Sequence, residues 1–214
     1  MPKVSVLMPA CNVEKYIREC MDSVVSQTLK DIEITVVNDG SKDGTPAILD
    51  EYAAADSRVR VVHKVNTGYG HSMNVALYMA TGEYIGVIET DDFADPEMFE
   101  TLYNAAVENN ADVVKSNYYD YYTTKPEKCG LVDNVGRVGV LGEVFAPEDH
   151  KEVFNVFPSI WSGIYRRQRI EDNHIMFTET LGASYQDTGF AFKIWASAER
   201  VLLLGDAFLH YRVR

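Results

Sequence analysis

The residues with the clearest chemical potential are the acidic segment Glu89-Thr-Asp91-Asp92, which directly follows an apolar run over residues 84–88. Adjacent carboxylates repel one another, so a chain that places them at a strand end usually supplies a cation or a hydrogen-bond donor beside them. Carboxylate oxygens suit Mg²⁺ or Mn²⁺, and Mg²⁺ held by one or two carboxylates keeps open positions for substrate phosphates. The segment therefore favours a metal and diphosphate site. A solvated strand end before an Asp95-Pro96 helix start explains the same residues, and the segment alone does not decide between the two.

Two further segments carry weaker signals. Asp39 stands between a predicted strand end and Gly40, where its carboxylate could accept a hydrogen bond from a base or a sugar, although Asn-Asp-Gly-Ser is also ordinary turn chemistry. The run Asn66-Thr-Gly68-Tyr-Gly70 precedes a predicted helix and could offer backbone amides to an anion. It lacks the last glycine of a dinucleotide fingerprint, so it indicates nucleotide binding only weakly.

Asp187 and His210 are the candidate residues of the second half. Asp187 begins an amphipathic helix, where it is either a simple N-cap or, if it points into a cleft, a general base. His210 is either a structural histidine or a metal ligand. Four tyrosines could line an acceptor cleft, since sugars stack on aromatic faces, or could belong to an edge strand: Tyr118, Tyr119, Tyr121 and Tyr122.

The elements that must position these residues alternate along the first half of the chain. Apolar runs predict strands at 3–8, 32–37, 59–63, 84–88 and 112–116, and helical spacing predicts helices at 14–26, 45–55, 70–79 and 96–109. This alternation predicts a mostly parallel sheet with helices on both faces. Ligands of such sheets bind at the carboxyl ends of the strands, and the polar residues named above follow strand ends. We therefore expect them to gather at one edge.

The second half follows a different pattern. After residue 119 the alternation stops, residues 159–167 indicate a strand that turns into a short helix, and residues 188–198 indicate a helix. Residues 201–204 and 209–212 suggest two closing strands. No linker or repeat separates the halves, so we expect one α/β domain with an asymmetric second half over residues 1–214.

The composition excludes several classes of function. Twenty Lys and Arg against 32 Asp and Glu give a net charge of −12, which would repel nucleic acid and anionic membrane surfaces. Cys11, Cys20 and Cys129 have neither zinc-ligand spacing nor the number of a disulfide framework, which favours a reducing compartment. The first residues lack the apolar core of a signal peptide, and no apolar run approaches the length that a membrane-spanning helix needs. We expect a cytoplasmic location.

Taken together, these segments resemble the family 2 glycosyltransferases of the GT-A fold over nearly the whole chain. The resemblance is carried by the opening run from Val4 to Ile17, by Val36-Val-Asn-Asp39-Gly-Ser41-Lys-Asp43-Gly-Thr45, and by Asn66-Thr-Gly68 with Asn74. Thr81-Gly82-Glu83-Tyr84-Ile before the acidic segment, Gln186-Asp187-Thr-Gly-Phe190 and His210-Tyr-Arg212 add to it. It implies a nucleotide-sugar-binding half over residues 1–118 and an acceptor-binding half over residues 119–214.

The resemblance also implies a role for each matching residue. Asp91 and Asp92 would hold Mn²⁺ or Mg²⁺ and the ribose, with His210 as a further metal ligand. Asp187 would be the base that takes the proton of the acceptor hydroxyl, giving inversion by single displacement. The nucleotide-sugar donor, with UDP as the expected nucleotide, would contact Pro9, Ala10, Asn12, Glu14, Asp39, Asn66, Gly68, Asn74 and Asp91. The acceptor would be a glycan or a lipid-linked saccharide, as in polysaccharide or cell-surface glycan biosynthesis.

Three positions depart from the family pattern. Cys11 stands where relatives usually carry an aromatic residue, Glu89 replaces an Asp, and Gln186 replaces a Glu beside the proposed base. These departures leave open a second reading, a catalytically degenerate module that binds nucleotide sugar or glycan. A sugar-phosphate nucleotidyltransferase ranks last, because the loop after the first strand lacks the glycines and arginines of that class.

Two expectations concern the assembly. We expect the chain to be the catalytic domain of a longer protein, because many relatives continue beyond the position of Arg214. Regions outside the chain could associate with the inner face of the membrane, and a homodimer is an open alternative.

Overall fold

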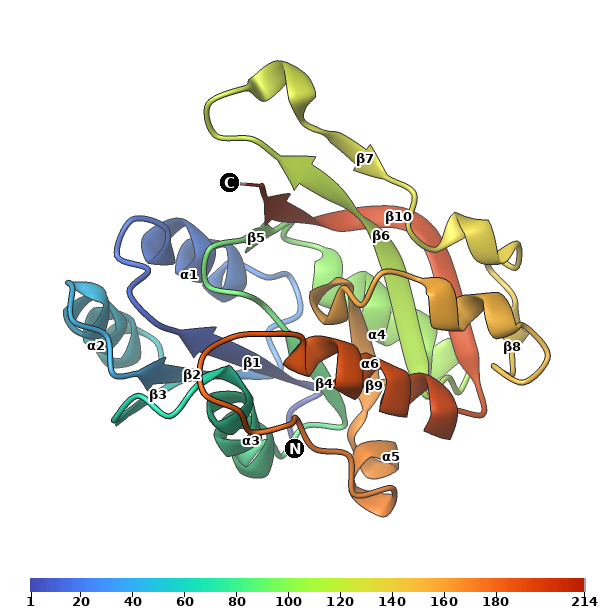
Figure 1. The fold of residues 1–214 in the computed structure, drawn as a ribbon, viewed down its shortest axis with the longest axis horizontal. Helices are drawn as coiled ribbons and strands as arrows, with labels where there is room; N and C mark the ends of the chain where they lie inside the picture. Colours follow the sequence, from blue (N-terminus) through green and yellow to red (C-terminus); the bar gives the residue numbers. More distant parts are fainter. Residues whose placement is uncertain (214) are drawn as a thin grey trace.

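The computed structural model describes residues 1–213, which form one mixed sheet with helices packed against it (Figure 1). The first part of the chain contains β1 (Val4–Ala10), α1 (Ile17–Val25), β2 (Ile32–Asp39), α2 (Thr45–Ala55), β3 (Val59–Lys64), α3 (Tyr69–Met79), β4 (Tyr84–Val87), β5 (Phe93–Ala94) and α4 (Met98–Glu108). The second part contains β6 (Val113–Tyr121), β7 (Gly130–Val132), β8 (Val144–Phe145), β9 (Gly163–Arg166), α5 (Arg167–Asp172), α6 (Gln186–Ser197) and β10 (Val201–Arg212).

The strand order confirms the predicted α/β architecture. The sheet runs β3-β2-β1-β4-β9-β6-β10-β5, with β7 paired to β6 and β8 paired to β10. The pairs β1–β2, β2–β3 and β1–β4 are parallel, whereas β9 runs antiparallel between β4 and β6. Parallel neighbours place the carboxyl ends of β1 to β4 at the same edge. In Figure 1, α6 lies in front of the sheet and α4 lies behind it.

Burial explains why the central strands lack polar alternation. All seven residues of β1 are buried, as expected for a strand covered on both faces. α1 instead buries one face, with Ile17, Met21 and Val24 at helical spacing. α2 has a proline at its first turn, a position where the missing amide is tolerated.

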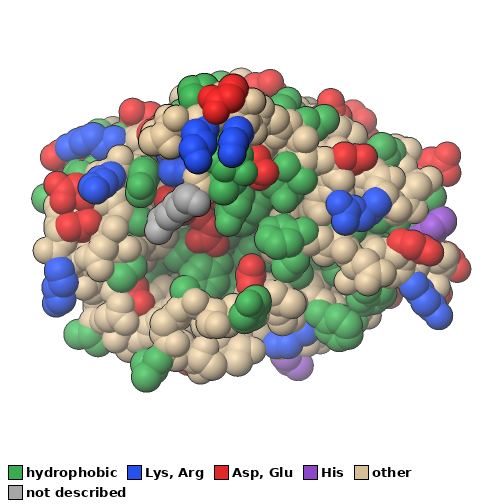
Figure 2. All heavy atoms as spheres, turned by 45° about the horizontal axis from the view of Figure 1, so that its top comes forward, with side chains coloured by type: hydrophobic (Ala, Val, Ile, Leu, Met, Phe, Trp, Pro, Cys, Tyr) green, Lys and Arg blue, Asp and Glu red, His purple; other side chains and the backbone are tan. Residues whose placement is uncertain are grey.

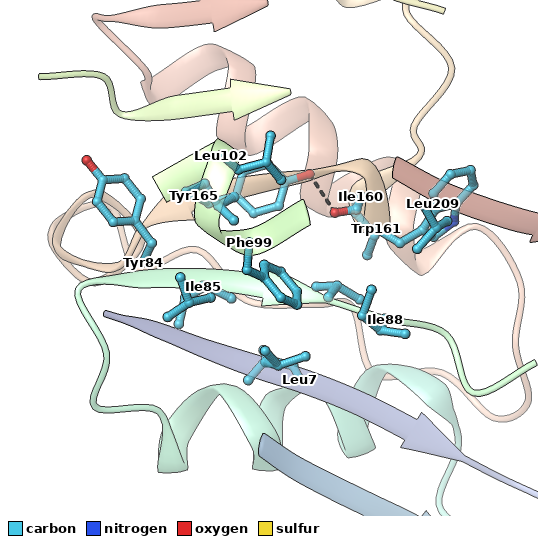
Figure 3. Close-up of a cluster of buried hydrophobic side chains, with 14 of the residues drawn as sticks. Leu7, Tyr84, Ile85, Ile88, Phe99, Leu102, Ile160, Trp161, Tyr165 and Leu209 are labelled. Atoms are coloured by element: carbon cyan, nitrogen blue, oxygen red, sulfur yellow. Dashed lines mark hydrogen bonds between the residues drawn. The ribbon is translucent and has the colours of Figure 1, made fainter. Parts of the chain in front are cut away.

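The core joins the two halves of the chain (Figure 3). Phe99 from α4 packs over β4 at Gly86, where an added Cβ would lie 2.5 Å from the ring, so the close approach requires glycine there. From the second half, the hydroxyl of Tyr165 donates a 2.8 Å hydrogen bond to the carbonyl of Ile160, drawn as the dashed line in Figure 3. The hydroxyl of Tyr84 likewise donates to the carbonyl of Ala111 at 2.8 Å, so both buried tyrosines have partners for their polar atoms.

One prediction about the second half was wrong, and one open alternative does not hold. The closing segments 201–204 and 209–212 form one strand, β10, because register shifts near Ala207 let pairing with β6 continue. Tyr118, Tyr119 and Tyr121 lie in β6, which is flanked by β9 and β10, so the edge-strand alternative for these tyrosines does not hold. No helix among residues 1–213 is long and apolar enough to cross a bilayer.

Candidate active site

The loops after β1, β2, β3 and β4 meet at the carboxyl edge of the sheet, as predicted from the sequence. They line a pocket of about 310 Å³, called the first pocket below. Figure 2 shows this face of the molecule as hollowed, with apolar and acidic side chains at the floor of the hollow. Six of the predicted donor-binding residues line the first pocket: Pro9, Ala10, Asp39, Asn66, Gly68 and Asp91.

Asp39 organises one wall of the first pocket. Its carboxylate pairs with the ammonium of Lys64 and accepts hydrogen bonds from the amides of Thr67, at 2.9 Å, and Gly68, at 3.0 Å. Burial by itself would raise the pKa of Asp39, but Lys64 and the two amides outweigh it and lower the pKa. Asp39 is therefore held as an anion and fixes the loop between β3 and α3.

The start of α3 is covered by the segment 178–183, called the strap below. Gly68 has a φ of +97°, and a Cβ there would lie 2.4 Å from the carbonyl oxygen of Thr180. At Gly70 a Cβ would lie 2.1 Å from the carbonyl oxygen of Thr178. The amide of Tyr69 donates to the carbonyl of Gly182 at 3.0 Å. The amides of this loop thus bind the Asp39 carboxylate and the strap, whereas the sequence had suggested that they could bind the anion of a ligand.

Tyr69 and Glu89 form a polar pair at the inner end of the first pocket. The Tyr69 hydroxyl donates a 2.6 Å hydrogen bond to Oε1 of Glu89. Burial raises the pKa of Glu89 to about 8; the Tyr69 bond opposes this rise, and the charges of Asp92, Asp91 and Asp187 add to it. The longer side chain of Glu89 is therefore bound to α3.

A second pocket of about 320 Å³ opens from the first. Four residues line both pockets: Tyr69, Glu89, Asp91 and Ala183. The second pocket also contains Asp92 and Asp187, so the acidic segment and the predicted base face one space.

The first turn of α6 positions Asp187. Its Oδ1 accepts a 2.8 Å hydrogen bond from the amide of Thr188, and a carboxylate there is stabilised by the positive end of the helix dipole. The neighbouring Gln186 is buried and also lines the second pocket, and its amide nitrogen donates to Oγ1 of Thr180 at 2.6 Å while its oxygen accepts from the amide of Ser184. Gln186 thus holds the strap beside Asp187.

The acidic segment is anchored by Arg212, the last residue of β10. Its backbone amide donates to Oδ1 of Asp92 and its Nε donates to the carbonyl of Asp91, both at 2.7 Å. Its guanidinium also bonds Glu19 and Thr123. The sequence placed Arg212 in a closing strand and gave no signal for this role.

Comparisons with known proteins agree with this geometry. The sequence model of glycosyl transferase family 2 matches residues 5–131. The chain belongs to glycosyl transferase family 2. It is 42% identical to the glycosyltransferase GlyG of Streptococcus pneumoniae over 99% of this chain and 71% of that protein. It is 33% identical to the uncharacterized glycosyltransferase EpsJ of Bacillus subtilis over 99% of this chain, but spans 61% of EpsJ.

Solved structures show the same fold for this family 2 chain. TarS of S. aureus, residues 1–349 in complex with UDP-GlcNAc, is 27% identical with a TM-score of 0.83, over 99% of this chain and 59% of the TarS chain. The mannosyltransferase PcManGT of Pyrobaculum calidifontis, in complex with GDP-Man and Mn²⁺, is 23% identical with a TM-score of 0.66, over 97% of this chain and 56% of that chain. The expected GT-A fold is thereby confirmed.

Three residues of this family 2 chain that were predicted to contact the nucleotide-sugar donor line neither pocket. Asn12 and Glu14 tie the loop after β1 to the loop after β2: the Asn12 Oδ1 accepts from the amide of Lys42 at 2.7 Å and the Glu14 Oε2 from the amide of Gly44 at 2.9 Å. Asn74 fastens the start of the strap, as its side chain forms two hydrogen bonds with the backbone of Phe177, at 2.9 and 3.0 Å. These three residues support the walls.

The predicted metal ligand His210 also lies outside both pockets. Its Nε2 is 3.0 Å from Oδ1 of Asp95, and its ring is stacked between Phe93 and Tyr119, with centroids 4.4 and 5.0 Å away. These contacts use one ring nitrogen and both ring faces. The structure therefore does not bring His210 to Asp91 and Asp92.

The aromatic wall of the second pocket differs from the predicted one. None of the four tyrosines at 118–122 lines the pockets that the described residues form; Tyr118 is buried edge-on against Trp161, with ring centroids 4.7 Å apart. The wall is built instead by Phe157, Trp161, Tyr185 and Tyr211. Trp161 and Tyr211 stack with centroids 5.1 Å apart. Their distance in sequence left no local pattern by which to find them.

The oxygen atoms that this family 2 site could offer to a metal suit a hard divalent cation. Asp91 and Asp92 offer carboxylate oxygens beside both pockets, and no described Lys, Arg or His lines either pocket. Among residues 1–213, no group of three or more His, Cys, Asp or Glu side chains could hold a metal ion. A Mn²⁺ or Mg²⁺ ion would thus need substrate oxygens as well, which is how Mg²⁺ is commonly bound with phosphates.

Proposed function

We propose that this chain is the catalytic part of an inverting glycosyltransferase that moves a sugar from a UDP-sugar to a hydroxyl of a glycan or lipid-linked acceptor. The observation that carries the proposal is the junction of the two pockets, where the acidic segment faces Asp187, a carboxylate in the first turn of α6. One pocket suits the donor and the other the acceptor. The likeness to TarS, whose structure holds UDP-GlcNAc, supports UDP as the nucleotide.

The chain's own residues supply binding and proton transfer. Asp39 would bind the base through its carboxylate, and Pro9, Ala10, Asn66 and Gly68 would enclose the nucleotide. Asp187 would accept the proton of the acceptor hydroxyl while that oxygen bonds to the anomeric carbon. The bond from the anomeric carbon to the diphosphate breaks in the same step, so its electron pair leaves with UDP and the configuration inverts.

A divalent cation on Asp91 and Asp92 would neutralise the charge that develops on the leaving diphosphate. Arg212 would hold both residues in place through its bonds to the Asp92 carboxylate and the Asp91 carbonyl. Among residues 1–213, no lysine, arginine or histidine lines either pocket, so no basic side chain there could neutralise the diphosphate in place of the cation.

We propose the cytoplasm as the site of action, at the inner face of the membrane where the acceptor is lipid-linked. The three cysteines are free, which is compatible with a reducing compartment. Relatives such as EpsJ are longer than this chain, so the acceptor, the membrane association and any homodimer belong to the whole protein.

The test is release of UDP from a panel of UDP-sugars in the presence of Mn²⁺ and a glycan mixture. We expect turnover by the unmodified chain, and at least a hundredfold slower turnover by Asp187→Asn with unchanged UDP affinity. Asp172→Asn, a carboxylate change on the exposed end of α5, is the matched control and should retain activity. Binding of UDP without turnover of any donor would instead support a degenerate binding module.

A further inference from the structure

The transferred sugar must occupy the junction of the two pockets, a point that rests on the proposed function. Its anomeric carbon is bonded to the diphosphate on one side and meets the acceptor oxygen on the other. The side chains that line both pockets are those of Tyr69, Glu89, Asp91 and Ala183. With Asp91 assigned to the metal and ribose, Tyr69 and Glu89 are the polar groups at the junction that are available to the sugar.

The pair is held rigidly. Tyr69 starts α3, its amide bonds the strap at Gly182, and its ring packs edge-on against Phe177 with centroids 6.1 Å apart. Among residues 1–213, the Glu89 carboxyl group accepts one side-chain hydrogen bond, from the Tyr69 hydroxyl to Oε1. Oε2 therefore remains for a ligand hydroxyl, with its direction set by the Tyr69 bond.

The charge of the junction limits the sugars that fit. Asp91, Asp92 and Asp187 all act on Glu89 electrostatically, and the lining of both pockets includes no described basic side chain. Two basic groups that contact residues of this site are already paired within the protein: Lys64 pairs with Asp39, and the guanidinium of Arg212 bonds Glu19 and the Asp91 carbonyl. The divalent cation proposed at Asp91 and Asp92 would have its charge balanced by those carboxylates and the diphosphate, so a sugar that carries its own carboxylate would meet a net negative field at the junction.

We propose that the Tyr69–Glu89 pair binds a hydroxyl group of an uncharged donor sugar, and that the junction rejects uronic acid donors. Glu89 is then a specificity-determining residue and Tyr69 a positioning residue that acts through it. This explains why Glu89 replaces the family's Asp, since the longer side chain reaches both Tyr69 and the sugar.

The proposal is tested by measuring equilibrium binding of five ligands to the protein in the presence of Mn²⁺. The ligands are UDP, UDP-glucose, UDP-galactose, UDP-GlcNAc and UDP-glucuronate. At least one uncharged UDP-sugar should bind about tenfold more tightly than UDP, and UDP-glucuronate should bind more weakly than UDP. Glu89→Ala should abolish the preference for the uncharged sugar while UDP affinity stays within about twofold. Tyr69→Phe should reduce the preference partly, and Glu89→Gln should retain it because the amide still bonds a hydroxyl. Glu108→Ala, at the exposed end of α4, is the matched control.

Three results would overturn the proposal. The first is equal binding of UDP-glucuronate and the best uncharged donor by the unmodified chain. The second is an unchanged sugar preference in Glu89→Ala, and the third is an equal loss for UDP and UDP-sugar, which would place Glu89 on the diphosphate. If circular dichroism shows that Glu89→Ala is unfolded, the sugar preferences of Tyr69→Phe and Glu89→Gln are compared instead. Equal preferences in these two variants would then overturn the proposal. Failure of UDP itself to bind the unmodified chain would refute the proposed function separately.

Discussion

The backbone amide of Arg212 donates a 2.7 Å hydrogen bond to the carboxylate of Asp92, 120 residues earlier in the chain. This bond joins the end of β10 to the acidic segment after β4. The side chain of Arg212 is buried between the rings of Tyr16 and Tyr121, each 4.9 Å from the guanidinium carbon. The last strand of the described chain is therefore part of the candidate site.

Replacing Arg212 with Met should loosen the acidic segment. The change removes charge-assisted hydrogen bonds to Glu19, Thr123 and the Asp91 carbonyl, and we expect the unfolding free energy to fall by about 3 kcal/mol. Urea unfolding measures this loss, and UDP titration with Mn²⁺ should show weaker binding. Arg18→Met, which breaks an exposed pair with Glu51, is the control and should leave both measurements nearly unchanged. Equal effects of the two variants would contradict the assigned role.

Asn74→Ala should release the strap. The buried side chain of Asn74 forms hydrogen bonds with the amide and the carbonyl of Phe177. Its Nδ2 also donates to the carboxylate of Glu179 at 2.8 Å. Leaving these groups unpaired should lower the unfolding free energy by about 2 kcal/mol. Chymotrypsin should also cut faster near Leu181 and Tyr185, which are 88% and 84% exposed. Asn109→Ala, on the end of α4, should not change the cleavage rate; a strap protected equally in both variants would refute the prediction.

The first half could be predicted from the sequence because its signals are local. Residues 45–55 were expected as a helix and form α2 with those bounds. Polar residues after each apolar run were expected at one edge, and parallel pairing of β1 with β2 and β4 brings them there. Periodicity and turn residues fix such elements without knowledge of distant contacts.

The remainder depends on contacts between distant residues. The insertion of β9 between β4 and β6 follows from pairing with strands about 80 and about 50 residues earlier, which no local period encodes. The same holds for the wall formed by Trp161 and Tyr211, and for the bond of Asn74 to Phe177. The family resemblance implied that His210 is a metal ligand, but the pairing of β10 with β5 directs it to Asp95 instead.

The buried Lys115 should give the protein a characteristic pH dependence of stability. Burial lowers the pKa of Lys115 to about 7, and its Nζ donates to the Ser159 carbonyl and to Oγ of Ser162. Between pH 7 and about 10 the unfolded chain binds a proton at this lysine that the folded chain does not, so the lysine makes stability rise with pH in that window. Lys115→Met should remove this contribution, which urea unfolding at pH 7, 8.5 and 10 would measure. The exposed Lys151→Met is the control, and equal pH slopes for Lys115→Met and the unmodified chain would contradict the prediction.

Cys11 provides a direct report on the first pocket, because its thiol is exposed and lines that pocket beside Asp39. Partial burial raises the pKa of Cys11, and the charge of Asp39 adds to the rise, so alkylation by iodoacetamide should accelerate as the pH increases toward 10. UDP with Mn²⁺ should slow that reaction at least fivefold by covering the thiol, as peptide mass analysis would show. Cys129 is also exposed but lies outside both pockets, so its alkylation rate should not respond to UDP. A Cys11 rate that is insensitive to saturating UDP would mean that the nucleotide binds elsewhere, since a base or ribose in the first pocket must lie against the loop that carries this residue.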